Sequence, residues 1–111
     1  MNGVLVDLEL HQLLYRAIQN KQLIRFVYEN KERIVEPHDY GIQKNVARLL
    51  SWQVAGSSGG RIPGWRWFDV AKVRGLETLN KSFPGNREVS RKHHHWDEIF
   101  IRVAPPEDPK H

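Results

Sequence analysis

From Lys21 onward, the chain consists of short runs rich in β-branched and aromatic residues, separated by polar or glycine-rich turns. Runs of this composition at this close spacing are typical of antiparallel strands, and five of them suit a small barrel. The first two are joined by the polar turn ENKE, and the third is followed by the glycine-rich loop SSGGRIPG. The expected strands are LIRFVYEN, KERIVEP, VARLLSWQVAG, WRWFDV and VRGLETL.

Pro37 is expected to end the second of these strands, because proline cannot donate a hydrogen bond to a neighbouring strand. Residues 38–45 are then expected to form a loop, with Gly41 and Asn45 as its turn residues.

The C-terminal part of the chain has a different character. Residues 80–92 are predicted to be a polar linker, and WDEIFIRV is a candidate final strand before a frayed tail. We therefore divide the chain into a barrel with its N-terminal helix, residues 1–83, and a C-terminal extension, residues 84–111.

One amphipathic helix is predicted before the strands. Its apolar residues recur at the helical spacing of three and four, and they are Leu10, Leu13, Leu14, Ala17 and Ile18. Asp7 is a candidate N-cap and Asn20 a plausible stop. The apolar stripe is expected to pack on the sheet or barrel; a dimer contact is the alternative.

The totals of the sequence exclude several classes of protein. A chain of 111 residues makes one domain, and its longest apolar run is too short for a membrane span. The absence of cysteine excludes disulfides and thiolate chemistry. The start MNGVLVDLEL has no basic region before an apolar stretch, so we expect no signal peptide and a cytoplasmic protein that makes no membrane contact.

Positive charge is concentrated in the middle of the chain. The net charge is +4, but residues 43–92 alone hold ten basic and three acidic side chains, whereas both flanks are slightly acidic. Such clustering is typical of proteins that bind a polyanion or an anionic small molecule. A solvated face that keeps the protein in solution is the alternative.

The aromatic segment LLSWQVAGSSGGRIPGWRWFDV lies inside this basic region. Because strand side chains alternate between faces, Arg48, Leu50, Trp52 and Val54 share one face of the third strand. An indole can stack on a base and a guanidinium can bind a phosphate with two hydrogen bonds, so Arg48 and Trp52 are candidate ligand contacts. Alternatively, Trp52 is a core residue and Arg48 points outward. Of Trp65 and Trp67, one is expected in the core and the other in the groove, and the pattern does not decide which.

The order of these parts resembles the WYL domain, a bacterial regulatory module with an Sm-like or SH3-like β-barrel. The resemblance covers roughly residues 13–83 and rests on AIQNKQLIRFVY, the element from Arg33 to Pro37, LLSWQVAG, and WRWFDVAKVRGLETL followed by SF at Phe83. It implies a mainly β fold: a small five-stranded Sm-like or SH3-like barrel with an N-terminal amphipathic helix, to which we add a C-terminal extra strand.

The chain departs from the family in two ways. The Trp-Tyr-Leu triad that names the family corresponds to Ser51, Trp52 and Gln53. Family members commonly sit behind a winged helix-turn-helix, for which these 111 residues leave no room, so we expect a stand-alone WYL-like domain without a sequence-reading element of its own.

Such domains are regarded as sensors that bind nucleic acid, often single-stranded, or anionic nucleotides, and that change the state of a partner regulatory or effector protein. The resemblance therefore implies a non-catalytic, ligand-binding role in regulation, including transcription regulation, with no cofactor. His38, Arg66 and Lys72 fall near polar or basic positions of the family pattern; a loop histidine bonded to a carbonyl and solvated surface charges are the alternatives. The full set of expected ligand contacts is His38, Arg48, Trp52, Gln53, Arg61, Arg66, Lys72 and Arg74.

Two other functions stay open. A protein-interaction adaptor or a homodimer would bury the tryptophans at a subunit contact. A metal-dependent hydrolase could use His93, His95 and Asp97, which share one face of an extended chain, although exposed neighbouring histidines are more simply an end to the basic patch. Catalysis has little support, because the chain lacks a phosphate loop, a dinucleotide fingerprint and a nucleophile elbow.

Overall fold

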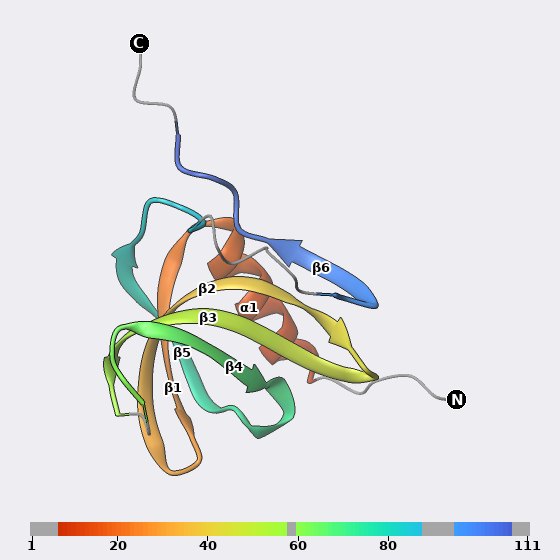
Figure 1. Cartoon of the computed structure of the whole chain (residues 1–111), viewed down its shortest axis with the longest axis horizontal. Coiled ribbons are helices and arrows are strands. Elements are labelled where there is room, and N and C mark those ends of the chain that lie inside the picture. The colour runs from red at the N-terminus through yellow and green to blue at the C-terminus, as the bar shows by residue number, and fades with distance from the viewer. Residues whose placement is uncertain (1–6, 58–59, 88–94, 108–111) are drawn as a thin grey trace.

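The strands of the computed structural model form one antiparallel sheet in the order β4-β3-β2-β1-β5, and β6 pairs with β2. The structure describes residues 7–57, 60–87 and 95–107. In Figure 1, β2 and β3 pass in front of α1, and β6 lies beside β2. The elements are α1 (Leu8–Gln19), β1 (Gln22–Tyr28), β2 (Lys31–Gln43), β3 (Val46–Gly56), β4 (Gly64–Asp69), the 3-10 turn η1 (Val70–Lys72), β5 (Arg74–Ser82) and β6 (Glu98–Arg102). This confirms the mainly β, barrel-like fold with an N-terminal helix and a C-terminal extra strand.

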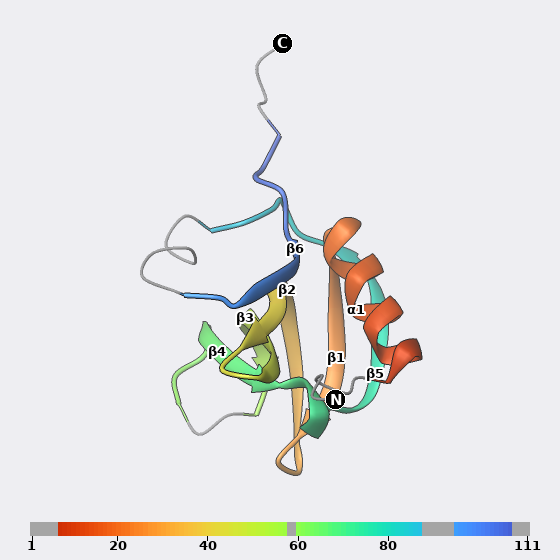
Figure 2. The ribbon, with the colours of Figure 1, turned by 90° about the vertical axis from the view of Figure 1, so that its right-hand side faces the viewer.

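The predicted helix is confirmed together with both of its ends. The Asp7 carboxylate accepts hydrogen bonds from the backbone N–H groups of Glu9 and Leu10, and Asn20 is the C-cap. The apolar stripe faces the sheet: Leu14, Ala17 and Ile18 are buried, and α1 contacts β1, β2, β5 and β6. In Figure 2, α1 lies beside β1 and β5, with β3 and β4 on the opposite side of the molecule.

The second strand is longer than predicted. The expected loop at residues 38–45 is wrong, because β2 continues through Pro37 to Gln43 and only Lys44 and Asn45 form a turn. Both turn residues have positive φ, at 53° and 64°, as a two-residue hairpin with a type I′ turn requires. Pro37 is accommodated inside β2 because the pairing with β3 shifts register between Pro37 and Asp39.

Gly41 lies where β6 approaches β2. A Cβ atom built on Gly41 would lie 2.2 Å from the backbone oxygen of Glu98 and 3.0 Å from the Cα of Ile99. Since both obstacles belong to a paired backbone, neither can move without disturbing the β2–β6 ladder. The C-terminal strand is therefore part of the same sheet, and its docking needs a glycine at this position.

We expect Gly41→Ala to lower the free energy of unfolding by about 1–3 kcal/mol, the usual cost of overpacking, with β6 as the first element to detach. Urea denaturation followed by circular dichroism measures the loss. Gly75→Ala is the comparison variant, because it brings the strain of a positive φ of +62° but has no atom within 4 Å of the built Cβ, whereas Gly41 has no positive φ. A Gly41→Ala protein as stable as the wild type would contradict the close approach of β6.

The core lies between α1 and the inner face of the sheet. Phe26 and Tyr28 of β1 each make an edge-on contact with Phe68 of β4, with ring centroids 4.9 Å apart. Tyr40 of β2 is fully buried under α1 and β6, where its hydroxyl and His11 Nδ1 are joined by a hydrogen bond of 2.7 Å. Phe100 of β6 packs edge-on against the Tyr40 ring at 4.9 Å. These contacts hold α1, β2 and β6 together.

Burial raises the pKa of Tyr40 to about 12 from its usual 10. The unfolded chain therefore loses this proton at lower pH than the folded protein, so the stabilisation is intact below pH 10 and is lost as the pH rises towards 12. We expect the free energy of unfolding to fall by about 2–3 kcal/mol more in the wild type than in Tyr40→Phe across this interval. Equal slopes for the two proteins in urea titrations would contradict the buried, protonated phenol.

Among the described residues, no helix has the length and apolar character needed to cross a bilayer.

Candidate functional site

The pairing of β3 with β4 sorts the expected ligand residues onto two faces of the sheet. Directly paired residues share a face, so Ser51 and Arg66 face inward together with Leu49 and Phe68. The outward pairs are Arg48 with Asp69, Leu50 with Trp67, and Trp52 with Trp65. The predicted alternation along β3 is therefore present, but it separates Arg66 and Gln53 from Arg48 and Trp52.

A cationic pocket opens at the end of the barrel where β1 turns into β2. Its volume is about 390 Å³, and Lys31, Arg33 and Arg66 supply three positive charges against the one negative charge of Glu29. We call it the mouth pocket; its lining is Tyr28, Glu29, Lys31, Arg33, Gly60, Arg66, Trp67 and Phe68. Cations beside aromatic rings in an open pocket suit a ligand that is both planar and anionic.

Arg33 is the buried cation of the mouth pocket. It is only 5 % exposed, and its guanidinium lies 5.6 Å from the centre of the Tyr28 ring and 5.5 Å from that of Phe68. Its hydrogen bonds are long: 3.3 Å to Gln53 Oε1 and 3.4 Å to the Tyr28 carbonyl. Desolvation by burial lowers the pKa of Arg33, although an arginine stays charged at neutral pH.

The charge of Arg33 is incompletely balanced. Its nearest carboxylate, on the exposed Glu29, lies 3.7 Å away, and its buried Nε has no hydrogen-bond partner among the described residues. A buried cation with long hydrogen bonds and a counter-ion at 3.7 Å is costly to maintain. An anion at the mouth pocket would supply the missing charge.

Arg66 is the second cation, and its backbone contacts hold it in place. Nη1 donates to the Trp65 carbonyl at 2.8 Å, and Nη2 donates to the Arg61 carbonyl at 2.6 Å. Its charge adds to the lowering of the Arg33 pKa, so the two guanidinium groups repel each other. The side chain of Arg61 is exposed and is absent from the pocket lining; its contribution is the carbonyl that positions Arg66.

Gln53 is fully buried and orients other groups. It accepts a hydrogen bond from Arg33 and donates to the carbonyls of Ala55 and Ser57, at 3.0 and 2.9 Å. The structure therefore places Gln53 behind Arg33, away from any direct contact with a ligand in solution.

Arg48 and Lys72 lie on the outer face, around Asp69. Arg48 Nε is 3.2 Å from one Asp69 oxygen, Arg48 Nη1 donates to Gln43 at 3.1 Å, and Lys72 is 3.9 Å from the other oxygen of Asp69. We expected Arg48 to bind a phosphate with its guanidinium. In the structure this guanidinium already contacts the Asp69 carboxylate and the Gln43 side-chain amide.

Trp52 is covered by an arginine of its own chain. The Arg87 guanidinium lies 4.4 Å from the centre of the Trp52 ring, and Trp65 packs edge-on against Trp52 at 5.1 Å. The expected base-stacking surface is therefore taken by Arg87 in this structure. The sequence did not decide which of Trp65 and Trp67 lies in the core. Trp65 packs against Trp52, whereas Trp67 is 36 % exposed and contacts Trp96.

His38 is fully buried. A hydrogen bond of 2.9 Å joins its Nδ1 to the Glu36 carbonyl, and its ring lies between Phe83 and Trp65 at 5.6 and 5.0 Å. The structure thus places His38 in the alternative role, a histidine bonded to a nearby carbonyl, and away from solvent.

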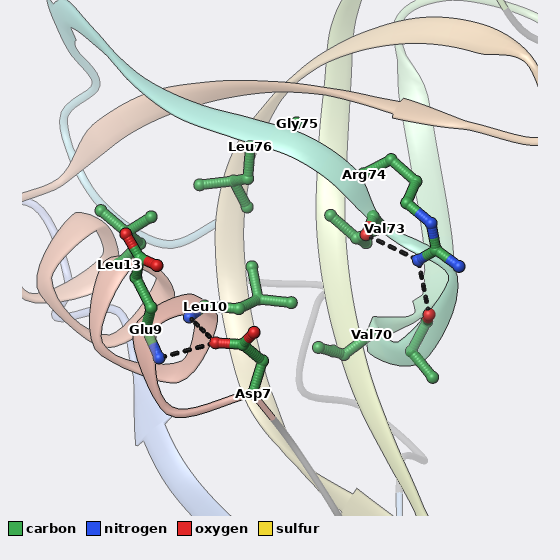
Figure 3. Close-up of a pocket in the computed structure, with 10 residues that line it drawn as sticks. Asp7, Glu9, Leu10, Leu13, Val70, Val73, Arg74, Gly75 and Leu76 are labelled. Atoms are coloured by element: carbon green, nitrogen blue, oxygen red, sulfur yellow. Dashed lines mark hydrogen bonds between the residues drawn. The ribbon is translucent and has the colours of Figure 1, made fainter.

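Arg74 lies at a separate pocket between α1 and β5, with a volume of about 550 Å³. Figure 3 shows its guanidinium bonded to the Ala71 and Val73 carbonyls, with Asp7 and Glu9 across the pocket. Two carboxylates against one arginine make this pocket unfavourable for an anion. Arg74 is thus not brought together with Arg66 and Arg33.

Sequence reasoning missed the role of three arginine and lysine side chains. The sequence pattern indicates Arg33 only as part of an Arg-x-x-x-Pro element, Lys31 only as part of a strand, and Arg87 only within a polar linker. A signal existed for Arg33. In a strand it shares a face with the apolar Val35, so its side chain is expected to point to the same side of the sheet as Val35. No local pattern indicated Arg87.

The metal hypothesis concerns residues at the edge of what the structure describes. His93 lies outside the described residues, and the Asp97 carboxylate accepts a hydrogen bond from the Lys44 backbone N–H at 2.7 Å. Within the described ranges, no three histidine, cysteine, aspartate or glutamate side chains are grouped as metal ligands.

No family model, curated protein or solved structure matches the chain. The WYL resemblance therefore stays a prediction from the motifs, and the functional argument depends on the geometry of the site.

Proposed function

We propose that the protein is a non-catalytic regulatory module that binds the phosphate of a nucleotide or of a short single-stranded nucleic acid in the mouth pocket. The observation that carries the proposal is the incompletely neutralised, buried Arg33 beside Arg66 and Lys31. Phosphate oxygens accept hydrogen bonds from guanidinium groups in pairs, and Arg66 is held by backbone contacts that leave it little conformational freedom to lose.

The aromatic residues of the pocket suit the rest of such a ligand. Tyr28 and Phe68 form the floor under Arg33, and Trp67 also lines the pocket, although its side chain belongs to the outer face of β4. Stacking of a base on an aromatic side chain contributes about 1–3 kcal/mol. A basic centre beside aromatic residues therefore favours a nucleotide over inorganic phosphate.

Fluorescence anisotropy with labelled single-stranded DNA and RNA of about ten nucleotides, in competition with mononucleotides, tests the proposal. We expect saturable binding that weakens as salt rises, because each phosphate contact releases a counterion. Arg66→Ala should weaken binding about tenfold and make the logarithmic salt dependence shallower by about 0.7 per lost contact on a single strand. Arg16→Ala, an exposed change of the same charge on α1, is the matched control and should bind like the wild type.

Three results would contradict the proposal. The first is no binding of oligonucleotides or nucleotides at low salt. The second is equal weakening by Arg66→Ala and Arg16→Ala, which would show attraction to net charge without a site. The third is a stable oligomer by light scattering that is independent of ligand and buries the tryptophans, which would favour the adaptor function.

A further inference from the structure

A second charged site lies on the outer face of the sheet, opposite the mouth pocket. Glu36 of β2 pairs directly with Trp52 of β3, which pairs in turn with Trp65 of β4. The Glu36 side chain is only 10 % exposed. Both of its oxygens accept hydrogen bonds from Arg87, from Nε at 3.1 Å and from Nη2 at 3.2 Å.

The two partners of this ion pair differ in their place in the fold and in their exposure. Glu36 and the tryptophans belong to paired strands, whereas Arg87 lies beyond β5 and has a side chain that is 43 % exposed. Within the described part of the chain, the Arg87 side chain contacts Glu36 and Trp52. The barrel strands therefore supply the carboxylate and the indoles, and the cation comes from a segment outside the barrel strands.

The shape of the receptor selects a guanidinium. A carboxylate that accepts from Nε and Nη2 matches the planar fork of arginine, and an indole 4.4 Å from the guanidinium carbon lies at cation–π distance. Lysine has a point charge without this fork, so it can satisfy only part of the site.

We propose that Glu36, Trp52 and Trp65 form a receptor for an arginine side chain in an extended segment of a partner protein, and that Arg87 is its built-in competitor. Removing Arg87 without replacement would leave a buried carboxylate unpaired, which is costly. Exchanging Arg87 for another arginine keeps the same hydrogen bonds and the same indole contact. The exchange therefore avoids this cost, and the partner competes with Arg87 for the same hydrogen bonds and indole contact.

Titration of the full chain with the peptide Gly-Arg-Gly, followed by tryptophan fluorescence, tests the receptor. We expect Arg87→Ala to bind this peptide saturably and at least ten times more tightly than the wild type, because the competitor is gone. Gly-Lys-Gly should bind Arg87→Ala at least ten times more weakly than Gly-Arg-Gly. Arg16→Ala is the matched control and should behave like the wild type.

Glu36→Gln combined with Arg87→Ala removes the acceptor charge while keeping the shape of the side chain, and should abolish binding of Gly-Arg-Gly. Circular dichroism verifies that each variant is folded, and Arg87→Lys, which retains a cation beside Glu36, serves as a second variant if Arg87→Ala unfolds. We then expect Arg87→Lys to bind Gly-Arg-Gly more tightly than the wild type.

Any of three outcomes would overturn the inference: no saturable binding to folded variants, equal binding of the arginine and lysine peptides, or unchanged binding after Glu36→Gln. A wild-type dimer that Arg87→Ala dissociates would also overturn it, because the arginine would then come from a second copy of this chain. None of these results depends on oligonucleotide binding at the mouth pocket, so the two proposals can fail separately.

Discussion

Phe68→Ala is expected to lower the free energy of unfolding by about 3–5 kcal/mol, the largest loss of stability that we predict. Phe68 is 1 % exposed and makes edge-on contacts with Phe26 and Tyr28, and its ring also lies under the Arg33 guanidinium. Its removal would leave a cavity at the junction of β1 and β4, beneath the mouth pocket. Urea denaturation followed by far-ultraviolet circular dichroism measures the loss.

The neighbouring residue provides the control for this prediction. Trp67 is larger than Phe68 but lies on the opposite face of β4 and is 36 % exposed. We expect Trp67→Ala to lower the free energy of unfolding by clearly less than Phe68→Ala, because the site stays hydrated and no enclosed cavity forms. If Trp67→Ala is the more destabilising change, the assignment of inner and outer faces along β4 is wrong.

Arg33→Met is expected to separate stability from binding. The variant should lose at least 100-fold in affinity for single-stranded oligonucleotides, because the buried member of the cationic pair is gone. Its free energy of unfolding should stay unchanged or rise by about 1–2 kcal/mol, since a buried charge with poor hydrogen bonds is replaced by an apolar side chain of similar length. Gln53 keeps its two hydrogen bonds to the Ala55 and Ser57 carbonyls.

Anisotropy titrations and urea denaturation on the same preparation measure both effects of Arg33→Met. Arg33→Lys is the companion variant, because it keeps the charge and removes the planar fork, and it should bind with intermediate affinity. A strong loss of stability without a loss of binding would show that Arg33 is a structural residue. Equal binding by Arg33→Met and the wild type would remove the mouth pocket as the ligand site.

The two faces of the β2–β3–β4 sheet present different chemistry. Inward, Lys31, Arg33 and Arg66 outnumber the one carboxylate, Glu29, in the lining of the mouth pocket. Outward, each described arginine beside the tryptophans has a carboxylate partner, Arg48 with Asp69 and Arg87 with Glu36. An anion is therefore favoured on the inner side, whereas the outer side offers a carboxylate and indoles to a cation.

The sequence by itself determined the local elements of this protein. The spacing of Leu14, Ala17 and Ile18 and the carboxylate of Asp7 were enough to predict the helix and its start. Alternation along β3 correctly grouped Arg48 with Trp52, and the polar turn at Glu29 and Asn30 marked the first hairpin. These features depend on residues close together in the chain. The side-chain periodicity of helices and strands, together with local capping and turn residues, is therefore enough to predict them.

Only the tertiary structure decided which charges meet. Arg33 and Arg66 are far apart in sequence and share a pocket because β2, β3 and β4 pair in one register, and a shift by one residue would turn Arg66 to the outer face. Arg87 reaches Trp52 through the path of the chain after β5, for which no local pattern exists. Pro37 lies inside a strand, next to a register shift between β2 and β3. Register and chain path are set by packing of the whole domain, and this is why the sequence indicated basic and aromatic residues but not their partners.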